Sequence, residues 1–362
     1  MPRDPHGGWD CVDSILKRLA SVRDSLVILL VSCIKGTTSP THDYATHSIQ
    51  TEFFSDQELA HIVGCLRHFG LFVRPFTSEM EFIEWVLAGG MEKEGYKQAL
   101  AYNTAHSGSG PGRKALLPAF CDLNGIPYTG SNPHVVSLAR HKFHSACVLQ
   151  SRGVRVPTSW FYVPGRGWLD GIAPPDGVKV IAKLTHESAS IGLSSDSVLV
   201  WDESLTDRID AIGVSFHQPV TVQQLISGSE VEVPIVDVAD GFAPMAVGIS
   251  VDGNALVGDA ILTYDLVNDD LYGFIDYQEN SNRMAETLKK TALNVARILE
   301  FRGLSRVDFR VDETGQHFVT DVSTSPHITP HSSFEFTFDR FDRAGTLPVL
   351  LVGLACQRLN WI

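Results

Sequence analysis

Four polar side chains between positions 306 and 323 have the types and the spacing that could do phosphate chemistry. Arg306 and Asp308 lie in one predicted strand, and Asp321 and Ser323 lie in the next. Because the residues of each pair are two apart, each pair shares one face of a pleated sheet. Proteins bind Mg²⁺ with one or two carboxylates together with substrate phosphates, so the pattern predicts a site for Mg²⁺ and phosphate. The alternative is a surface hairpin whose charged side chains face water.

A lysine followed by a hydroxyl-rich loop is a second candidate for phosphate binding. Lys183 is the charged residue of the apolar segment 180–183, where an unpaired charge would be costly to bury. The segment 185–192 that follows is rich in Ser and Thr and ends in Gly192. Lysine and free backbone N–H groups both stabilise phosphate charge, although the order of a Walker loop is absent. The alternative is a strand-edge lysine before an ordinary polar loop.

A third group of polar residues flanks the turn at 227–229. Gln223 and Gln224 precede this turn, and Glu230 and Glu232 follow it. An acidic residue beside a tight turn can accept hydrogen bonds from ribose hydroxyls, and exposed strand backbone can contact an adenine edge. By itself this signal is weak.

Two types of secondary structure pattern would position these groups. Up to residue 87, strands at 26–34 and 71–75 alternate with helices at 55–68 and 79–87, which predicts a small α/β domain with a parallel sheet. From residue 178 the pattern is antiparallel β structure, with strands at 178–184, 197–201, 220–226, 230–236, 246–251 and 254–262 and the hairpin at 306–322. One long helix is predicted at 282–299.

Between these regions the sequence predicts a glycine-rich loop and two helices. The loop at 103–112 precedes a helix at 113–123, whose N-terminal backbone N–H groups could bind an anion; a plain linker is the alternative. The segment 133–152 predicts one helix that contains Lys142. His141 and His144 in this helix are three apart, but no third ligand lies at zinc spacing.

Composition describes a folded protein that does not bind nucleic acid or membrane surfaces in general. The 362 residues exceed one ordinary core, so two or three domains are expected. Acidic residues outnumber basic ones, 42 against 29, and give a net charge of -13, which opposes binding to anionic polymers. The six cysteines have no C-x-x-C spacing, which favours reduced thiols and a cytoplasmic location.

The apolar run at 26–34 raises the question of membrane targeting. It is far shorter than the roughly 20 residues that span a bilayer. It could be the core of a signal peptide, but Asp13 and Asp24 lie in the flank before it and Gly36 follows closely. A buried first strand is therefore favoured.

Taken together, five motifs in order resemble the ATP-grasp superfamily, and most closely the D-alanine-D-alanine ligase family. The resemblance covers roughly residues 103–334. The motifs are Gly125-Ile126-Pro127-Tyr128-Thr129-Gly130-Ser131 with Lys142 downstream, Ile181-Ala182-Lys183 with the loop to Gly192, Ile226-Ser227-Gly228-Ser229-Glu230-Val231, Arg306-Val307-Asp308-Phe309, and Asp321-Val322-Ser323-Thr324-Ser325-Pro326.

The resemblance implies roles for individual residues. Lys142 and Lys183 would contact ATP phosphates beneath the loop 187–192, in which Glu187, Ser188 and Ser190 would also contact ATP. Gln224 and Ile226 would meet adenine through their backbone, Gln223 takes the position of an acidic residue that faces the adenine amino group, and Glu230 would hold the ribose. Asp308, Asp321 and Ser323 fall on the metal-ligand positions. Arg306, Ser190 and His327 would lie at the reacting groups.

Several positions depart from the family pattern. Asp321 and Ser323 replace glutamate and asparagine, which puts a second metal ion in doubt. His327 replaces a glycine whose backbone N–H helps to form the oxyanion hole; a solvated loop histidine is the alternative. The first substrate-binding loop is replaced by 35–40, and segment 263–276 has no lysine. Ser332 and Ser333 could still bind the carboxylate of an acceptor.

We therefore predict α/β and α+β structure in a three-domain ATP-grasp fold. The expected parts are an N-terminal extension at 1–24, an N-terminal α/β domain at 25–130, a central lobe at 131–222 and a C-terminal lobe at 223–362. The implied activity is ATP-dependent ligation of a carboxylate to an amine, both small molecules such as amino acids, with one or two Mg²⁺ ions or with Mn²⁺. The alternatives are D-alanine-D-alanine ligase itself and an ATP-binding protein with little catalysis. The oligomeric state stays open, with a homodimer as one alternative.

Overall fold

The N-terminal part is a parallel three-stranded sheet between helices, as predicted. The computed structural model describes residues 7–279 and 281–362, and its first sheet has the order β2-β1-β3. The strands are β1 (Val27–Val31), β2 (Phe72–Phe76) and β3 (Ala99–Asn103), and the helices are α2 (Asp56–His68), α3 (Glu79–Leu87), α4 (Gly90–Lys93) and α5 (Leu116–Asn124). The apolar β1 is the central strand, with a parallel neighbour on each side.

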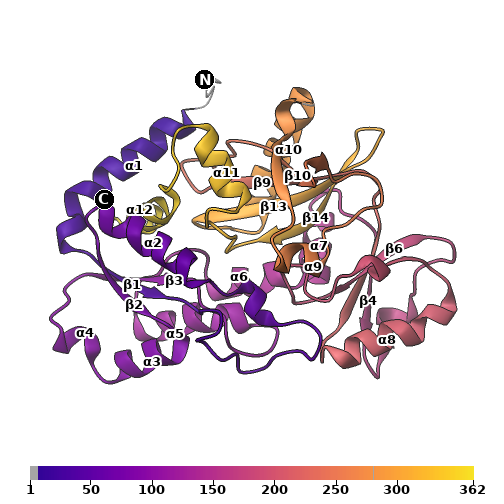
Figure 1. Cartoon of the computed structure of the whole chain (residues 1–362), viewed down its shortest axis with the longest axis horizontal. Coiled ribbons are helices and arrows are strands. Elements are labelled where there is room, and N and C mark those ends of the chain that lie inside the picture. The colour runs from indigo at the N-terminus through magenta and orange to yellow at the C-terminus, as the bar shows by residue number, and fades with distance from the viewer. Residues whose placement is uncertain (1–6, 280) are drawn as a thin grey trace.

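The helix α1 (Gly8–Val22) packs against the last helix of the chain, α12 (Leu347–Arg358). Its residues Val12, Ile15 and Leu19 are fully buried at helical spacing. Figure 1 shows α12 beside both α1 and α2. The sequence analysis assigned this segment to an N-terminal extension, whereas α1 packs into the core of the N-terminal part. The domain boundaries themselves stay a prediction.

The central part is an antiparallel five-stranded sheet with the order β5-β4-β8-β6-β7, next to α8 (Thr206–Ser215). Its strands are β4 (Ser159–Val163), β5 (Gly167–Trp168), β6 (Lys179–Leu184), β7 (Val198–Val200) and β8 (Val220–Gln224). The strands β6 and β8 pair directly, so Lys183 lies opposite Thr221 and close to Gln223. This pairing places the lysine at the end of the sheet that meets the C-terminal part.

The single helix predicted at 133–152 is wrong, because the structure contains α6 (Pro133–Arg140) and α7 (Lys142–Ser151). His141 between them is extended, with φ -85° and ψ 91°. Its side chain accepts from the backbone N–H of His144 and caps α7. The backbone N–H of Lys142 donates to the Thr185 carbonyl, 3.1 Å away, so the break ties the start of α7 to the hydroxyl-rich loop.

The C-terminal part is a six-stranded antiparallel sheet with the order β11-β10-β9-β13-β14, in which β12 also pairs with β10. The strands are β9 (Ser229–Val236), β10 (Val247–Val251), β11 (Asn254–Ala255), β12 (Gly273–Asp276), β13 (Leu304–Val311) and β14 (His317–Ser323). Helix α10 (Asn282–Ile298) packs on one face with Leu288, Ala292 and Val295 fully buried. Helix α11 (Ser333–Arg340) follows the last strand.

Two predicted elements are shorter than expected. The strand predicted at 254–262 ends after Ala255, because the carbonyls of Gly258 and Ala260 accept hydrogen bonds from the Arg310 guanidinium instead of a strand. The helix predicted at 113–123 opens with the 3-10 turn Arg113–Ala115, so α5 begins at Leu116.

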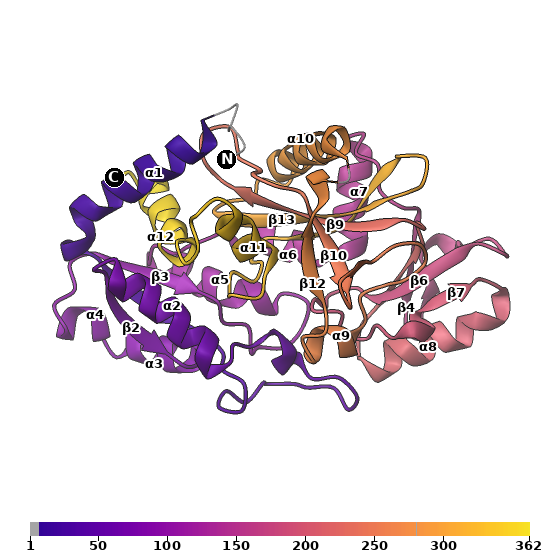
Figure 2. The ribbon, with the colours of Figure 1, turned by 45° about the horizontal axis from the view of Figure 1, so that its top comes forward.

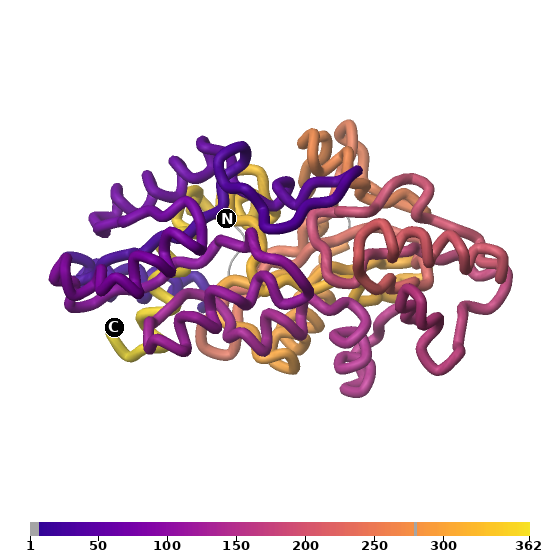
Figure 3. The backbone as a smooth tube through the Cα atoms, turned by 90° about the horizontal axis from the view of Figure 1, so that it is seen from below, coloured from indigo at the N-terminus to yellow at the C-terminus, as the bar shows by residue number. Residues whose placement is uncertain are grey.

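The three parts meet around one region. Helix α9 (Tyr264–Asn268) lies near the central part, below β10 and β12 (Figure 2). The Tyr264 hydroxyl bonds to Ser48 N–H and to the Thr51 hydroxyl in the N-terminal part. In Figure 3 the indigo N-terminal loop reaches toward the central sheet, where the Tyr44 ring packs edge-on against Phe216. Within 7–279 and 281–362, no helix combines the length and apolarity needed to cross a membrane.

Candidate active site

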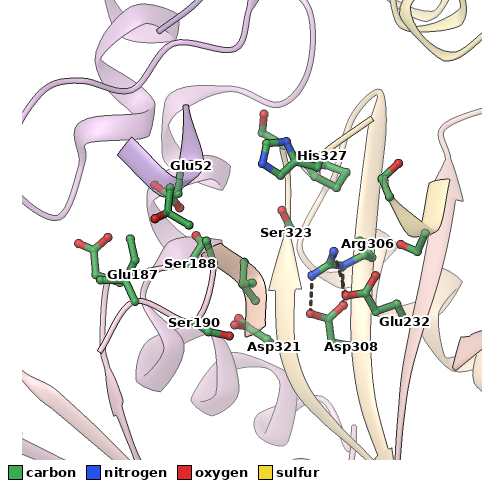
Figure 4. A pocket seen from close by; sticks show the side chains of 18 of the residues that line it. Glu52, Glu187, Ser188, Ser190, Glu232, Arg306, Asp308, Asp321, Ser323 and His327 are labelled. Carbon is green, nitrogen blue, oxygen red and sulfur yellow. Dashed lines mark hydrogen bonds and ion pairs between the residues drawn. The ribbon is translucent and has the colours of Figure 1, made fainter. Parts of the chain in front are cut away.

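A cavity of about 640 Å³ opens where the three parts meet. Every residue that the sequence analysis selected lines this cavity. From α7, the loop 185–192 and the strands β6 and β8 with the residues after β8, these are Lys142, Lys183, Glu187, Ser188, Ser190, Gln223, Gln224 and Ile226. From the C-terminal part they are Glu230, Arg306, Asp308, Asp321, Ser323, His327, Ser332 and Ser333. Figure 4 shows Glu187 and Ser188 on one side of the pocket and Arg306 and Asp308 on the other.

The carboxylates of the cavity form a row across three adjacent strands. Glu232 on β9 lies opposite Asp308 on β13, and Asp308 lies opposite Asp321 on β14. The predicted hairpin is present, and Arg306 lies opposite Ser323 two residues along. Because residues in register on antiparallel strands lie on the same face of the sheet, the row directs three acidic side chains at one region.

Arg306 neutralises part of this row. Its Nε and Nη2 atoms donate to the two carboxylate oxygens of Asp308 at 2.7 and 2.9 Å, a bidentate pair. Its Nη1 lies 3.0 Å from Glu232 Oε1. Burial raises the pKa of Asp308, and the negative charge of Asp321 raises it further. Arg306 lowers this pKa, but by less than burial and Asp321 together raise it.

Lys142 and Lys183 reach the same row from the central part. Lys142 Nζ lies 2.7 Å from Asp321 Oδ2. Burial alone would raise the pKa of Asp321, but the two lysines outweigh it and hold that pKa below its usual value. Lys183 Nζ donates to Gln223 Oε1 at 3.0 Å, and burial lowers the pKa of this lysine. The predicted phosphate lysines thus lie beside the predicted metal carboxylates.

The donor set fits a Mg²⁺ ion that also binds phosphate. Asp308 and Asp321 face each other in register, and Ser323 adds a hydroxyl two residues along β14. Among the residues that the structure describes, no group of three or more His, Cys, Asp or Glu side chains could hold a metal by itself. Phosphate oxygens would therefore have to complete the coordination sphere.

The turn beside Glu230 is held by a buried arginine. Arg310 donates to the carbonyls of Gly228 at 3.2 Å and Gly258 at 2.9 Å, and to Glu230 Oε2 at 3.1 Å. Arg310 lies opposite Glu230 in the β9–β13 pairing. Gln224, on the preceding strand, commits its backbone N–H to the Thr158 carbonyl at 2.8 Å, so an adenine contact through that N–H would need this bond to open.

The loop at 185–192 has a tightly constrained backbone. Ala189 and Ser190 are consecutive residues with left-handed φ values of 50° and 54°, a conformation that is costly for residues with a Cβ. The Ser190 hydroxyl donates to the Leu262 carbonyl at 2.8 Å. Gly192 closes the loop with φ 84°, and a Cβ there would lie 2.6 Å from Leu184 Cδ1. These contacts hold the loop over the cavity.

Glu187 takes part in a buried charge cluster made of Glu52, Arg113, Lys114, Arg140 and Glu187. Arg113 Nη2 contacts Glu52 Oε2 at 2.5 Å and Glu187 Oε2 at 2.8 Å. Arg140 Nη2 lies 3.0 Å from Glu187 Oε2, and Lys114 Nζ lies 2.9 Å from Glu52 Oε1. The Glu187 carboxylate is therefore bound by arginines and is not free to contact ATP as the sequence predicted without breaking these pairs.

His327 and the two serines line the cavity from the segment that follows β14. His327 is exposed to the cavity, and the enclosing protein lowers its pKa although Glu58 opposes this change. The Ser332 hydroxyl caps α11, accepting from the Glu335 N–H at 3.1 Å and donating to the Thr329 carbonyl at 2.8 Å. Ser333 is fully buried at the start of the helix. A ligand carboxylate would therefore have to displace the cap to bind the Ser332 hydroxyl.

Sequence reasoning misses several charged residues of the cavity. Arg310 could have been found, since it continues the two-residue spacing of Arg306 and Asp308 on one strand face. Arg113 and Lys114 begin the helix predicted at 113–123, for which the sequence analysis considered only the backbone N–H groups as anion ligands and not these two side chains. No local pattern marks Glu52 or Arg140, because their partners are more than 40 residues away in the sequence.

The chain is similar in sequence to proteins of one family. The family model described as "D-ala D-ala ligase C-terminus" matches residues 173–345. The D-alanine-D-alanine ligase of Azoarcus sp. (strain BH72) is 28% identical over 242 residues, which are 67% of this chain and 74% of that protein. The enzyme of that name from Nitrosospira multiformis is 28% identical over 277 residues, 75% of this chain and 81% of that protein. The chain is therefore similar to D-alanine-D-alanine ligases over two thirds or more of its length.

Solved structures agree with this family at the level of the fold. The D-alanine-D-alanine ligase from Bacillus anthracis complexed with ATP has a TM-score of 0.64 at 16% identity, covering 92% of this chain and 99% of that one. The enzyme from Coxiella burnetii has a TM-score of 0.61 at 16% identity, covering 93% and 95%. The predicted ATP-grasp fold is confirmed for this D-alanine-D-alanine ligase-like chain.

Proposed function

We propose that the protein is an ATP-dependent ligase that joins a carboxylate to an amine through an acyl-phosphate. The row of carboxylates and the cations bound to it support this proposal most strongly. Asp308 lies opposite Asp321 in the pairing of β13 with β14. Arg306 donates hydrogen bonds to Asp308, and Lys142 forms an ion pair with Asp321. This arrangement stabilises charge at a reacting phosphate and then at a reacting carbonyl.

ATP would lie between the central and C-terminal sheets. Lys142 and Lys183 would bind its phosphates, with Ser188 and Ser190 from the loop above them. Gln223, Gln224 and Ile226 would face the adenine, and Glu230, held by Arg310, would accept hydrogen bonds from the ribose hydroxyls. When bound by Asp308, Asp321 and Ser323, Mg²⁺ would supply positive charge to the β- and γ-phosphate oxygens.

In the first step a carboxylate oxygen of the donor attacks the γ-phosphorus of ATP, and ADP leaves. Lys142 and Lys183 offset the negative charge on the transferred phosphoryl group and on the departing ADP. Lys142 would exchange its contact with Asp321 for a phosphate oxygen as ATP binds. The product of this step is an acyl-phosphate.

In the second step the amine attacks the acyl carbon, and phosphate leaves with the oxygen that came from the donor. Arg306 lies where it can donate to the oxyanion of the tetrahedral intermediate, since two of its five N–H groups remain after its bonds to Asp308 and Glu232. The backbone N–H of His327 would add a second donor. The attacking nitrogen loses its proton, and an amide forms.

D-alanine-D-alanine ligation is the second candidate, favoured by the names of the relatives. It differs from the first only in the substrates. We further propose small-molecule substrates and a cytoplasmic location, which the six free thiols support.

The test uses the purified chain with ATP, Mg²⁺, a panel of carboxylates that includes D-alanine, and hydroxylamine as the amine. Hydroxylamine traps an acyl-phosphate as a coloured hydroxamate. We expect hydroxamate and ADP to form together with at least one carboxylate. Tight ATP binding without ADP or hydroxamate across the panel would instead identify an ATP-binding protein that does not catalyse ligation.

A further inference from the structure

The buried charge cluster defines one end of the cavity, opposite the row of carboxylates. Figure 4 shows Glu52, Glu187 and Ser188 on one side and Arg306, Asp308 and Glu232 on the other. The Glu52 and Glu187 side chains are 4% and 5% exposed, and Arg113 and Arg140 are each 4% exposed. Lys114 is the most open member at 18%.

The cluster contains more positive than negative charge. Its cations are Arg113, Lys114 and Arg140 and its carboxylates are Glu52 and Glu187, so three charges oppose two. The neighbouring His106 does not alter this balance, because burial and the nearby cations lower its pKa well below the usual value and keep it neutral. Burial of an uncompensated charge is costly, so the surplus cation calls for an anion.

The surplus is located at Lys114 and Arg140. Arg113 pairs with both carboxylates, and its Nη1 donates to the His106 carbonyl at 2.8 Å. Lys114 Nζ and Arg140 Nη1 each donate to the Ser188 hydroxyl at 3.2 Å. A neutral hydroxyl compensates little of their charge.

Arg140 also offers an unused donor. Its residue is 7% exposed, and its Nε–H has no hydrogen-bond partner in the part of the chain that the structure describes. Buried guanidinium N–H groups are normally paired, and Arg140 lines the cavity. Burial and the neighbouring arginines also lower the pKa of Lys114 to about 8, although Glu52 opposes this change, which is the sign expected where cations crowd without enough counter-charge.

At this end Glu52 offers no free carboxylate oxygen to an ammonium group. Both oxygens of Glu52 accept from cations, Oε1 from Lys114 and Oε2 from Arg113. The nearby Glu58 uses its Oε2 in a capping box, accepting from the N–H and hydroxyl of Ser55 at 2.8 and 3.0 Å. An α-amino acid such as D-alanine brings an ammonium group, which would meet Lys114 and Arg140 here.

We propose that the acyl donor carries a second anionic group, such as another carboxylate, and that Lys114 and Arg140 bind this group beside Ser188. The proposal rests on the proposed ligase function and names the class of its donor. Lys114 and Arg140 come from different segments of the chain, so the pocket distinguishes a diacid from a monoacid by charge and by reach.

The test compares donors of similar size in the hydroxamate assay: malonate, succinate and glutarate against propionate and D-alanine. We expect the kcat/KM of at least one diacid to exceed the values for propionate and for D-alanine by about tenfold or more, since a charge-assisted hydrogen bond contributes about 1.5 to 3 kcal/mol. Lys114→Met should abolish this advantage and leave propionate within about twofold, whereas Lys114→Arg should retain it. Lys290→Met, which removes an exposed lysine of α10, is the matched control.

Three results would overturn the proposal. The first is a wild-type preference for D-alanine or propionate over every diacid, which would leave the ligase function intact. The second is an equal loss for all donors in Lys114→Met. The third is a weaker binding of a non-hydrolysable ATP analogue, but not of ADP, in that variant, since the anion would then be the γ-phosphate of ATP.

A binding measurement separates this proposal from the ligase function itself. If no carboxylate yields hydroxamate, calorimetric titration of the three diacids into the protein with ADP and Mg²⁺ decides. Diacid binding that is lost in Lys114→Met and kept in Lys114→Arg supports the anion site even though the ligase function has failed. Absence of diacid binding to the wild type overturns the anion site as well.

Discussion

Lys142 Nζ lies 2.7 Å from Asp321 Oδ2, so a lysine at the start of α7 is paired with a carboxylate near the end of β14. This pair connects the central part of the molecule to the C-terminal sheet. Lys142 is predicted to bind the phosphates of ATP, and Asp321 is predicted to bind the metal ion. The two side chains contact each other directly until ATP and the metal ion separate them.

Replacing Lys142 should therefore impair both partners. In Lys142→Met, Asp321 loses the cation that lowers its pKa most, and the phosphates lose one donor. We expect the KM for ATP to rise about tenfold or more, in line with one charge-assisted hydrogen bond. Lys290→Met on α10, outside the cavity, serves as the control in steady-state assays of ADP release. An unchanged KM would show that Lys142 does not contact ATP.

Glu232 should make the stability of the protein depend on pH. Burial raises its pKa to about 7 from 4.5, although Arg306 opposes the rise. Between these values the folded state binds more protons than the unfolded state, so the free energy of unfolding falls as pH increases from about 4.5 through about 7. In Glu232→Gln this loss is absent.

The measurement is the melting temperature of Glu232→Gln relative to the wild type at pH 5 and pH 8. We expect the melting temperature of the variant, relative to that of the wild type, to be higher at pH 8 than at pH 5. Each kcal/mol of unfolding free energy that the wild type loses between these pH values corresponds to about 2 to 4 °C. Glu286→Gln on the surface of α10 should show a constant difference. A parallel pH dependence of Glu232→Gln and the wild type would refute the raised pKa.

Arg310 should be needed for both stability and nucleotide binding. Its side chain is 6% exposed and joins Glu230 to the carbonyls of Gly228 and Gly258. Arg310→Met would leave the Glu230 carboxylate without its cation and the carbonyls without their donor, at a cost of about 3 to 5 kcal/mol.

Thermal melting and ADP titration test this role of Arg310. We expect a lower melting temperature and weaker ADP binding. Arg155→Met, which removes an exposed arginine that lies over the Phe318 ring, should melt within a few degrees of the wild type. Normal ADP affinity in Arg310→Met would show that nucleotide binding does not depend on the turn at 227–229 that Arg310 holds.

Gly228 should tolerate no side chain. A Cβ at this position would lie 1.9 Å from the Val311 carbonyl oxygen, a backbone atom that cannot move aside alone. We expect Gly228→Ala to unfold at a markedly lower temperature. Gly64→Ala in α2, where nothing lies within 4 Å of the new Cβ, should be neutral or slightly more stable, by about 0.5 to 1 kcal/mol. Equal melting temperatures for the two variants would contradict the close approach of these segments.

The sequence was sufficient to predict the hairpin that contains Asp308 and Asp321, but not its register. The apolar and polar pattern predicts two strands around the turn at 312–315, whereas a β-bulge between Asp308 and Phe309 shifts the pairing by one residue and places Asp308 opposite Asp321. The break at His141 could not be predicted from the helical pattern, because its cause is the tertiary bond from the Lys142 N–H to the Thr185 carbonyl.

The buried charge cluster was not predictable for a similar reason. Glu52, Arg113, Arg140 and Glu187 are adjacent only after the N-terminal and central parts have assembled. Each residue alone has the pattern of an ordinary surface charge. The family resemblance did not help, since it assigned Glu187 to the ATP loop without showing the arginines that bind its carboxylate.

The central claim is that a donor carboxylate attacks the γ-phosphate of ATP beside Asp308 and Asp321. The most direct measurement uses a donor that supports turnover, labelled with ¹⁸O in its carboxylate, and analyses the released phosphate by mass spectrometry. An acyl-phosphate intermediate requires one ¹⁸O atom from the donor in each phosphate released, and Asp308→Asn should release almost no phosphate. Amide formation with unlabelled phosphate would contradict the mechanism.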